Sequence, residues 1–315
     1  MRREELLRMF PERMRHRWQE TADLCGKLQE IRLRAGQPVT VVVGDGEMFV
    51  DGEGRIVDRQ DAGVRITAQE IEEMIQHLCQ YSLYAFADEI RQGFLTIQGG
   101  HRVGMAGQVI LEDTGRIRNI KYIRYLNIRI ANQVKGAADE VLPFLYEKGR
   151  VCNTLLISPP GGGKTTMLRD IIRQISDGTV YGQGVNVGVV DERSEIAGSY
   201  MGIPQNDVGS RTDVLDGCPK AEGMMMLIRS MAPQVIAVDE LGSDRDMEAL
   251  QMASGCGCKL MATIHGSSLS EIQNKKYIRY VIEEGMFDRY VILKRVNGYC
   301  VVEGVYDREG KPCIR

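Results

Sequence analysis

Residues 154–166 read TLLISPPGGGKTT, and this stretch decides the fold of the second half of the chain. It opens with the largely apolar residues 154–157, which are typical of a buried strand. Glycines follow at 161–163, and from Met167 to Ile175 the apolar residues recur at helical spacing. A strand, a glycine-rich loop and a helix in this order predict a loop that binds the phosphate groups of a nucleotide.

The residue types in this loop suit a nucleoside triphosphate. Backbone N–H groups of residues 161–163 can turn inward around phosphate oxygens, and the start of the helix adds positive potential. Lys164 supplies a charge for the β and γ phosphates, and the Thr165 hydroxyl is a ligand for Mg²⁺. We therefore predict that ATP and Mg²⁺ bind here. The predicted nucleotide-binding residues are Ser158, Pro159, Pro160, Gly161, Gly162, Gly163, Lys164, Thr165 and Thr166.

The loop departs from the usual pattern, G-x-x-x-x-G-K-[ST], at one position. Ser158 stands where the first glycine is expected, and Pro159 and Pro160 stiffen the chain after it. The alternative interpretation is a glycine-rich turn that binds nothing. Lys164 and Thr165 stand at the positions that the pattern requires, and they favour the phosphate loop.

A phosphate loop needs a carboxylate on another strand to hold Mg²⁺, and a hydrolase also needs a base that polarises water. Residues 234–240, QVIAVDE, place Asp239 and Glu240 at the end of a short apolar run. In a parallel sheet, this end lies at the edge where the phosphates bind. We predict that Asp239 and Thr165 are the metal ligands and that Glu240 is a catalytic residue. The alternative is that the two acids only cap the next helix.

Two further strand ends carry candidate catalytic residues. Residues 187–193, VGVVDER, repeat the pattern, and we predict that Glu192 is a second catalytic acid. The alternative is a structural ion pair between Glu192 and Arg193. His265 follows the apolar residues 260–264, where a polar side chain can sense the γ-phosphate or its water. The alternative is a histidine with a purely structural role.

The strands around these motifs alternate with helical patterns, which predicts an α/β fold with a parallel-sheet core. We expect this domain to span residues 136–315. Its expected elements are strands at 154–157, 185–190, 235–238 and 260–264, a helix at 139–148, a polar loop at 207–217, and a hairpin of 290–293 with 299–305 around a turn at Asn297-Gly298.

Residues 1–135 are expected to form a smaller, mixed α/β domain. Thr67 and Glu70 form a capping-box pattern that opens a helix, and the apolar face of this helix consists of Ile71, Met74, Ile75 and Leu78. Strands are expected at 38–43, 94–97, 103–111 and 117–130, with a hairpin turn at 44–46. These patterns alone assign no task to the domain.

Composition narrows the function classes. The chain has 315 residues, 43% hydrophobic and 26% charged, with a formal net charge of −3, which is ordinary for a globular protein. A nucleic-acid coat carries a strong basic excess, so no nucleic-acid partner is expected. No apolar run approaches the roughly 18 residues of a membrane-spanning helix, and MRREELLR at the start lacks the apolar stretch of a secretory signal. We therefore expect a cytoplasmic protein. Its isolated cysteines are expected to be buried reduced thiols: Cys25, Cys79, Cys152, Cys218 and Cys300.

Three of these stretches resemble the secretion and type IV pilus ATPases, which are RecA-like P-loop enzymes. Residues 260–267 resemble their His box, and residues 190–192 stand where their acidic Asp box falls. Residues 227–240 resemble the helix, proline and strand that approach their Walker B acid, although those enzymes often have glycine where this chain has Asp239. The resemblance implies a RecA-like P-loop ATPase domain over residues 136–315.

The match to the stage III sporulation protein AA family is closer still. It rests on residues 157–166, 189–196 and 207–216, and on residues 31–38 and 100–104 near the start. The resemblance implies the Mg²⁺-dependent ATPase of a sporulation channel complex, on the mother-cell cytoplasmic side of a membrane, docked on a small membrane protein. The ATPase resemblances further imply a ring, such as a hexamer, in which residues 1–135 supply docking and subunit contacts.

Ring motors complete each site with an arginine from a neighbouring subunit. The candidates are Arg102, Arg124, Arg129, Arg211 and Arg229.

Two other functions stay open at this point. A nucleic-acid-dependent ATPase of RecA type would need stacking aromatics and a basic groove, but aromatic residues total 6%. An ATP-binding scaffold with little turnover would have no need of Glu240.

Overall fold

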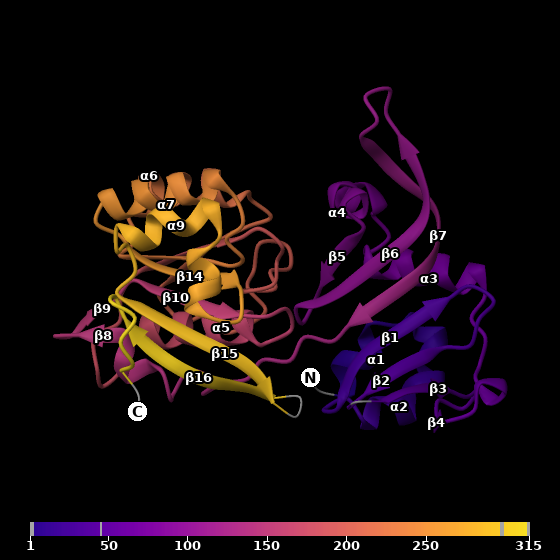
Figure 1. The fold of residues 1–315 in the computed structure, drawn as a ribbon. Helices are drawn as coiled ribbons and strands as arrows, with labels where there is room; N and C mark the ends of the chain where they lie inside the picture. Colours follow the sequence, from indigo (N-terminus) through magenta and orange to yellow (C-terminus); the bar gives the residue numbers. More distant parts are fainter. Residues whose placement is uncertain (1–2, 45, 297–298, 314–315) are drawn as a thin grey trace. The chain divides into compact units, whose positions relative to one another are not determined.

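The computed structural model describes residues 3–44, 46–296 and 299–313. The chain divides into two units, Met1–Asn132 and Gln133–Arg315, whose elements are labelled in Figure 1. Within the described residues, no helix is both long and apolar enough to span a membrane.

Unit 1 is built on a seven-stranded antiparallel sheet with the order β4-β3-β2-β1-β7-β6-β5. Its strands are β1 (Leu28–Arg34), β2 (Thr40–Val43), β3 (Gly46–Val50), β4 (Ile56–Val57), β5 (Phe94–Ile97), β6 (His101–Leu111) and β7 (Ile117–Arg129). Its helices are α1 (Arg3–Arg8), η1 (Glu12–Trp18), α2 (Gln19–Asp23), η2 (Gln60–Ala62), α3 (Ala68–Leu78), η3 (Leu83–Phe86) and α4 (Ala87–Gln92). The four strands expected from the sequence are present as β2, β5, β6 and β7. Asp45, in the expected hairpin turn, lies outside the described residues.

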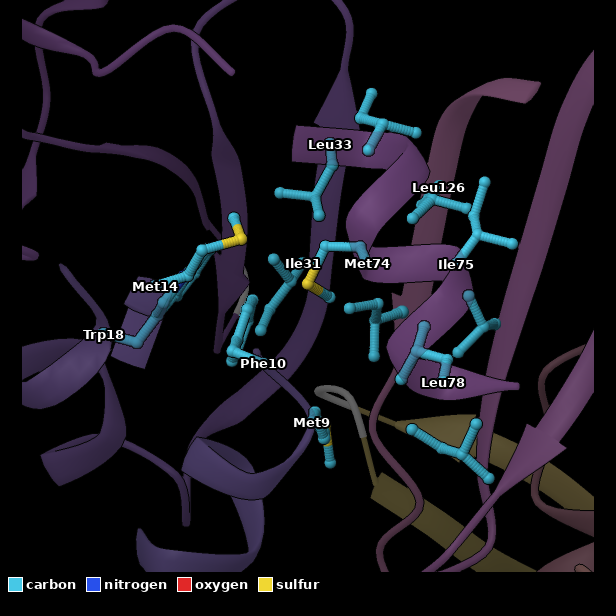
Figure 2. Packing of buried hydrophobic residues seen from close by; sticks show 14 of the residues in the cluster. Met9, Phe10, Met14, Trp18, Ile31, Leu33, Met74, Ile75, Leu78 and Leu126 are labelled. Carbon is cyan, nitrogen blue, oxygen red and sulfur yellow. The ribbon is translucent and has the colours of Figure 1, made fainter. Parts of the chain in front are cut away.

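The capping box that opens α3 is confirmed. Thr67 Oγ1 accepts a hydrogen bond from the Glu70 N–H at 3.1 Å, and the Thr67 N–H donates to Glu70 Oε2 at 2.8 Å. This fixes the start of a helix whose apolar face is buried, as predicted. In Figure 2, Met74 on that face lies beside Ile31 of β1 in the hydrophobic core.

The same core holds Trp18, the one tryptophan of the sequence. Its ring stacks on Phe10 with the ring centroids 4.0 Å apart and an angle of 18° between the ring planes. Both side chains are buried, so Trp18 fluorescence reports the integrity of this core.

Unit 2 contains a second seven-stranded sheet, with the order β12-β11-β13-β14-β10-β15-β16. All neighbours pair in parallel except β15 and β16, which are antiparallel. The strands are β10 (Thr154–Ser158), β11 (Val187–Asp191), β12 (Thr212–Asp216), β13 (Val235–Val238), β14 (Lys259–His265), β15 (Arg289–Val296) and β16 (Tyr299–Asp307). The helices are η4 (Leu142–Leu145), α5 (Lys164–Asp177), α6 (Lys220–Met231), α7 (Asp244–Gly255), α8 (Leu269–Gln273) and α9 (Lys276–Glu283).

Helices cover this sheet on both faces (Figure 1). On one face, Leu168 and Ile171 of α5 share a buried cluster with Leu156 of β10. On the other face, Leu250 of α7 shares a cluster with Leu155. Alternate residues of β10 therefore face opposite layers, as a strand buried on both sides requires. The predicted α/β class with a parallel-sheet core is confirmed.

Two local predictions are wrong. Residues 139–148 do not form a helix: they contain η4 and the strand β8 (Tyr146–Glu147), which pairs with β9 (Arg150–Val151). Lys148 and Gly149 have φ of 50° and 77°, the left-handed values of a two-residue hairpin turn, and these values break a helix.

The predicted loop at 207–217 contains strand β12, which pairs in parallel with β11 at the sheet edge. An edge strand is covered by fewer neighbouring elements, so it can contain polar residues. The sequence of β12 therefore lacks the apolar run from which the other strands were predicted. Asn297 and Gly298, the predicted turn of the last hairpin, lie outside the described residues.

We expect Ile128→Ala to destabilise unit 1 by about 2–5 kcal/mol, because truncating a fully buried side chain leaves a cavity. Ile128 is 0% exposed and lies in β7 between Ile31 and Val103 of the adjacent strands. Urea unfolding followed by Trp18 fluorescence measures the loss. The control is Val109→Ala, at a side chain that is 46% exposed. Equal midpoints for the two variants would contradict the assignment of this core.

Candidate nucleotide site

The loop at residues 159–163 joins the end of β10 to the start of α5. Gly161 and Gly163 have φ of 70° and 92°, a backbone conformation that side chains other than glycine rarely adopt. A Cβ on Gly162 would lie 1.9 Å from Ser158 Oγ and 3.0 Å from the Pro159 carbonyl oxygen, so a side chain here would displace Ser158. Gly161 and Gly163 are therefore needed for the backbone conformation of the turn, and Gly162 leaves room for Ser158.

Lys164, the first residue of α5, turns its ammonium group back into the loop. Its Nζ lies 3.2 Å from the Ser158 carbonyl oxygen, 3.3 Å from that of Pro159 and 3.0 Å from His265 Nδ1. The side chain is buried, and this burial lowers its pKa, while the nearby carboxylates of Asp239 and Glu240 raise it. The ammonium group of Lys164 thus lies inside the loop, where its hydrogen-bond partners are two carbonyl oxygens and an imidazole nitrogen.

Asp239 follows β13 and meets the start of α5. Its Oδ2 accepts a hydrogen bond from Thr165 Oγ1 at 2.5 Å, and its Oδ1 accepts one from Thr263 Oγ1. A hydroxyl and a carboxylate oxygen so close together are the hard ligands that a divalent cation such as Mg²⁺ prefers. The donor set therefore fits the ion that the loop pattern implies.

Glu240 lies next to Asp239 in a strained backbone conformation, with φ of 57°. Its N–H donates to Thr263 Oγ1 at 2.8 Å, which holds the turn against β14. The Glu240 carboxylate lies between a guanidinium and an imidazole. Arg193 Nη1 is 2.5 Å from Oε2, and His265 Nε2 is 3.1 Å from Oε1. The side chains of Lys164, His265 and Glu240 thus form one connected chain.

Asp191, at the end of β11, has a different environment. Its carboxylate is buried and accepts hydrogen bonds from the N–H groups of Glu195, Ile196 and Ala197 at 2.8, 3.2 and 2.8 Å. Burial raises the pKa of Asp191, and the three donors act in the opposite direction. Asp191 therefore anchors the turn at residues 194–197.

Glu192 pairs with Lys220 of α6, and Arg193 pairs with Glu240. Glu192 still lies in the same small cavity as both predicted acids. The residues that line this cavity are Asp191, Glu192, Arg193, Glu195, Lys220, Asp239 and Glu240.

Two residues of the site were missed by the sequence analysis. Thr263 binds both the Asp239 carboxylate and the Glu240 backbone, and its only sequence signal is a hydroxyl within an apolar strand. Arg169 of α5 is buried and donates to the carbonyl oxygens of Glu195 and Ile196, each at 2.5 Å. No local pattern marks Arg169, because its partners lie 26 and 27 residues away.

The arginine candidates lie in varied surroundings. In unit 2, Arg211 precedes β12, and its carbonyl oxygen accepts a hydrogen bond from the N–H of Val187, the first residue of β11. Arg211 therefore lies at the amino ends of these strands, whereas the phosphate loop follows the carboxyl end of β10. In unit 1, Arg124 pairs with Glu72 at 2.9 Å. Arg102 lies 3.6 Å from the centroid of the Phe94 ring.

Comparison with known proteins places the chain in a family. A family model described as "Sporulation stage III, protein AA" matches residues 1–313. Stage III sporulation protein AA of Bacillus subtilis (strain 168) is 40% identical over 312 residues, which cover 99% of this chain and 97% of that protein.

Solved structures of ATPases share the fold. The ATPase DotB of Yersinia pseudotuberculosis has a TM-score of 0.61 at 13% identity, covering 96% of this chain and 81% of that chain. The pilus retraction motor PilT with bound ADP has a TM-score of 0.53 at 16% identity, covering 88% and 78%. The fold expected from the ATPase resemblance is thus confirmed, and the whole-length match shows that the chain belongs to the sporulation stage III protein AA family.

Proposed function

We propose that this chain is a Mg²⁺-dependent ATP hydrolase that works in a ring and powers or assembles a membrane channel complex during sporulation. One observation carries the proposal. A buried lysine, a hydroxyl–carboxylate pair and a second carboxylate converge where β10, β13 and β14 end, as hydrolysis of a nucleoside triphosphate requires.

The phosphate chain would lie in the glycine loop. The backbone N–H groups of residues 161–163 and the start of α5 favour negative charge there. Lys164 would exchange the carbonyl oxygens of Ser158 and Pro159 for phosphate oxygens, which are charged acceptors and form stronger hydrogen bonds.

Glu240 would take the proton of the attacking water. Its carboxylate is one-third exposed, so water reaches it, and His265 and Arg193 fix its orientation from both sides. His265 also reaches Lys164, which places it between the base and the phosphate chain. Glu192 lies in the same cavity and is the second candidate for this proton transfer.

Thr165 and Asp239 would hold Mg²⁺, because their oxygens already lie at hydrogen-bond distance from each other. When bound, such an ion neutralises charge on the phosphate oxygens. Asp191 has no place among these ligands, because backbone N–H groups already occupy its carboxylate.

Family membership supports the biological part of the proposal. We infer a peripheral position on the mother-cell cytoplasmic face of a membrane, where the ring would dock on a small membrane protein of the channel. We assign the docking and subunit contacts to residues 1–135, and no nucleic acid takes part.

Lys164→Ala should abolish ATP binding or turnover with the fold intact. The lysine contributes charge toward phosphate rather than packing, so thermal unfolding followed by circular dichroism should change little. Equilibrium binding of a fluorescent ATP analogue and phosphate release measure the loss.

Lys276→Ala is the matched control, since Lys276 is an exposed lysine at the start of α9. Wild-type affinity and rate in Lys164→Ala would rule out the phosphate-loop assignment. Single-stranded DNA, added to the wild-type assay, should leave the rate unchanged, whereas strong stimulation would favour a nucleic-acid-dependent enzyme.

Glu240→Gln should trap ATP. The amide keeps the size of the side chain but does not accept the proton of the attacking water, so hydrolysis should fall by about 10²-fold or more while ATP still binds. Single-turnover hydrolysis and nucleotide binding, measured on the same preparation, separate these two effects.

Glu248→Gln, at an exposed position of α7, tests whether loss of any nearby carboxylate has the same effect. If Glu240→Gln hydrolyses ATP at a near-normal rate, the catalytic role moves to Glu192.

A ring in which one subunit completes its neighbour's site predicts rescue by mixing. A chain with Arg102→Ala, Arg124→Ala or Arg129→Ala keeps its phosphate loop, and a Lys164→Ala chain keeps its arginines. If one of these arginines acts on the neighbouring subunit, the mixture should recover ATPase activity that neither variant shows alone. Absence of rescue in every mixture would restrict residues 1–135 to docking.

A further inference from the structure

The hairpin of β15 and β16 extends beyond the sheet on the side of the phosphate loop. β15 runs parallel to β10, and their register pairs Ile157 with Ile292. β10 ends one residue later at Ser158, whereas β15 continues to Val296. Because the strands are parallel, the extra residues of β15 lie at the edge where the loop begins.

Side chains of this extension lie close to the loop. Arg295 pairs with Cys300 across the hairpin. Arg295 Nη1 lies 3.7 Å from the position that a Cβ on Gly161 would take. Cβ and Sγ of Cys300 both lie 2.7 Å from the corresponding position at Gly163. Cys300 is exposed rather than buried, which corrects the expectation from the sequence.

The hairpin is therefore a neighbour of two of the glycines, Gly161 and Gly163, in addition to their own turn. A side chain at Gly163 would collide with Cys300, and a Cβ at Gly161 would be in ordinary van der Waals contact with the Arg295 guanidinium. The hairpin is therefore one wall of the space in front of the loop, built by residues more than 130 positions further along the chain.

Arg295 brings a second positive charge to this space. Lys164 is buried inside the loop, whereas Arg295 is exposed and its guanidinium lies near Gly161. The neighbouring Lys294 is turned to Glu303, with Nζ 3.5 Å from its Oε1. A guanidinium presents a planar set of N–H donors that matches phosphate oxygens and keeps its charge at any physiological pH.

We propose that Arg295 binds the phosphate chain of the nucleotide held by its own subunit. The inference rests on the proposed function, since it assigns a further phosphate-binding residue to the same site. It differs from an arginine supplied by a neighbour, because the hairpin and the loop belong to one sheet of one chain. Arg295 would contact the phosphates from the solvent side while Lys164 contacts them from within.

The test is equilibrium binding of a fluorescent ATP analogue to full-length chains with Arg295→Ala, Arg295→Gln or Arg295→Lys. We expect affinity to fall about 10- to 100-fold in the alanine and glutamine variants, as loss of a charged hydrogen bond implies. The lysine variant keeps the charge but not the planar donors, so it should recover part of the affinity. Lys294→Ala is the matched control on the same strand and should bind as the wild type does.

The outcomes separate this inference from the proposed function. If the wild type binds ATP, Lys164→Ala does not, and Arg295→Ala binds as the wild type does, then the inference falls and the function stands. Equal affinity in the glutamine and lysine variants would also overturn it, because charge would then have no part. If the wild type binds no ATP, both fall together.

Discussion

The candidate site depends on the parallel register of three strands. β10 and β14 pair so that Ser158 lies opposite His265, and β13 and β14 pair so that Val238 lies opposite Ala262. This register brings the start of the glycine loop, the acids after β13 and the histidine to one edge without any long side chain. A shift of one residue would turn Thr263 to the other face and remove the support of both acids. The chemistry of the edge is therefore fixed by backbone hydrogen bonds within the sheet.

Within that edge, the polar side chains form one connected network. Lys164 contacts His265, His265 contacts Glu240, and Glu240 contacts Arg193, so the imidazole links the lysine to the carboxylate and the carboxylate pairs with a guanidinium. The nearby carboxylates of Asp239 and Glu240 offset part of the cost of burying Lys164, because an unpaired buried charge would be expensive.

The sequence was informative where the signal is local. The glycine loop, the strand before it and the acids at 239–240 each form a short pattern, because a strand, a turn and a strand end are decided by neighbouring residues. Contacts such as Arg193 with Glu240, 47 residues apart, leave no such trace. The strand hidden in 207–217 lies at the sheet edge, where burial imposes no apolar pattern. The helix expected at 139–148 failed for another local reason, since Lys148 and Gly149 together form a tight hairpin turn.

The sequence Val-Asp-Glu occurs twice at strand ends, and its aspartate has a different environment each time, so strand ends alone do not predict the site. Val-Asp-Glu occurs at 190–192 and again at 238–240, at the ends of adjacent strands. Asp191 lies under the turn at 194–197, and three N–H groups occupy its carboxylate. Asp239 lies beside α5, and its carboxylate meets hydroxyl groups, which a metal ion can share. Arg169 reinforces the difference, because it binds carbonyl oxygens of the turn that Asp191 holds. The role of each acid follows from the donors that the neighbouring segment brings to it, and those donors are set by the tertiary fold.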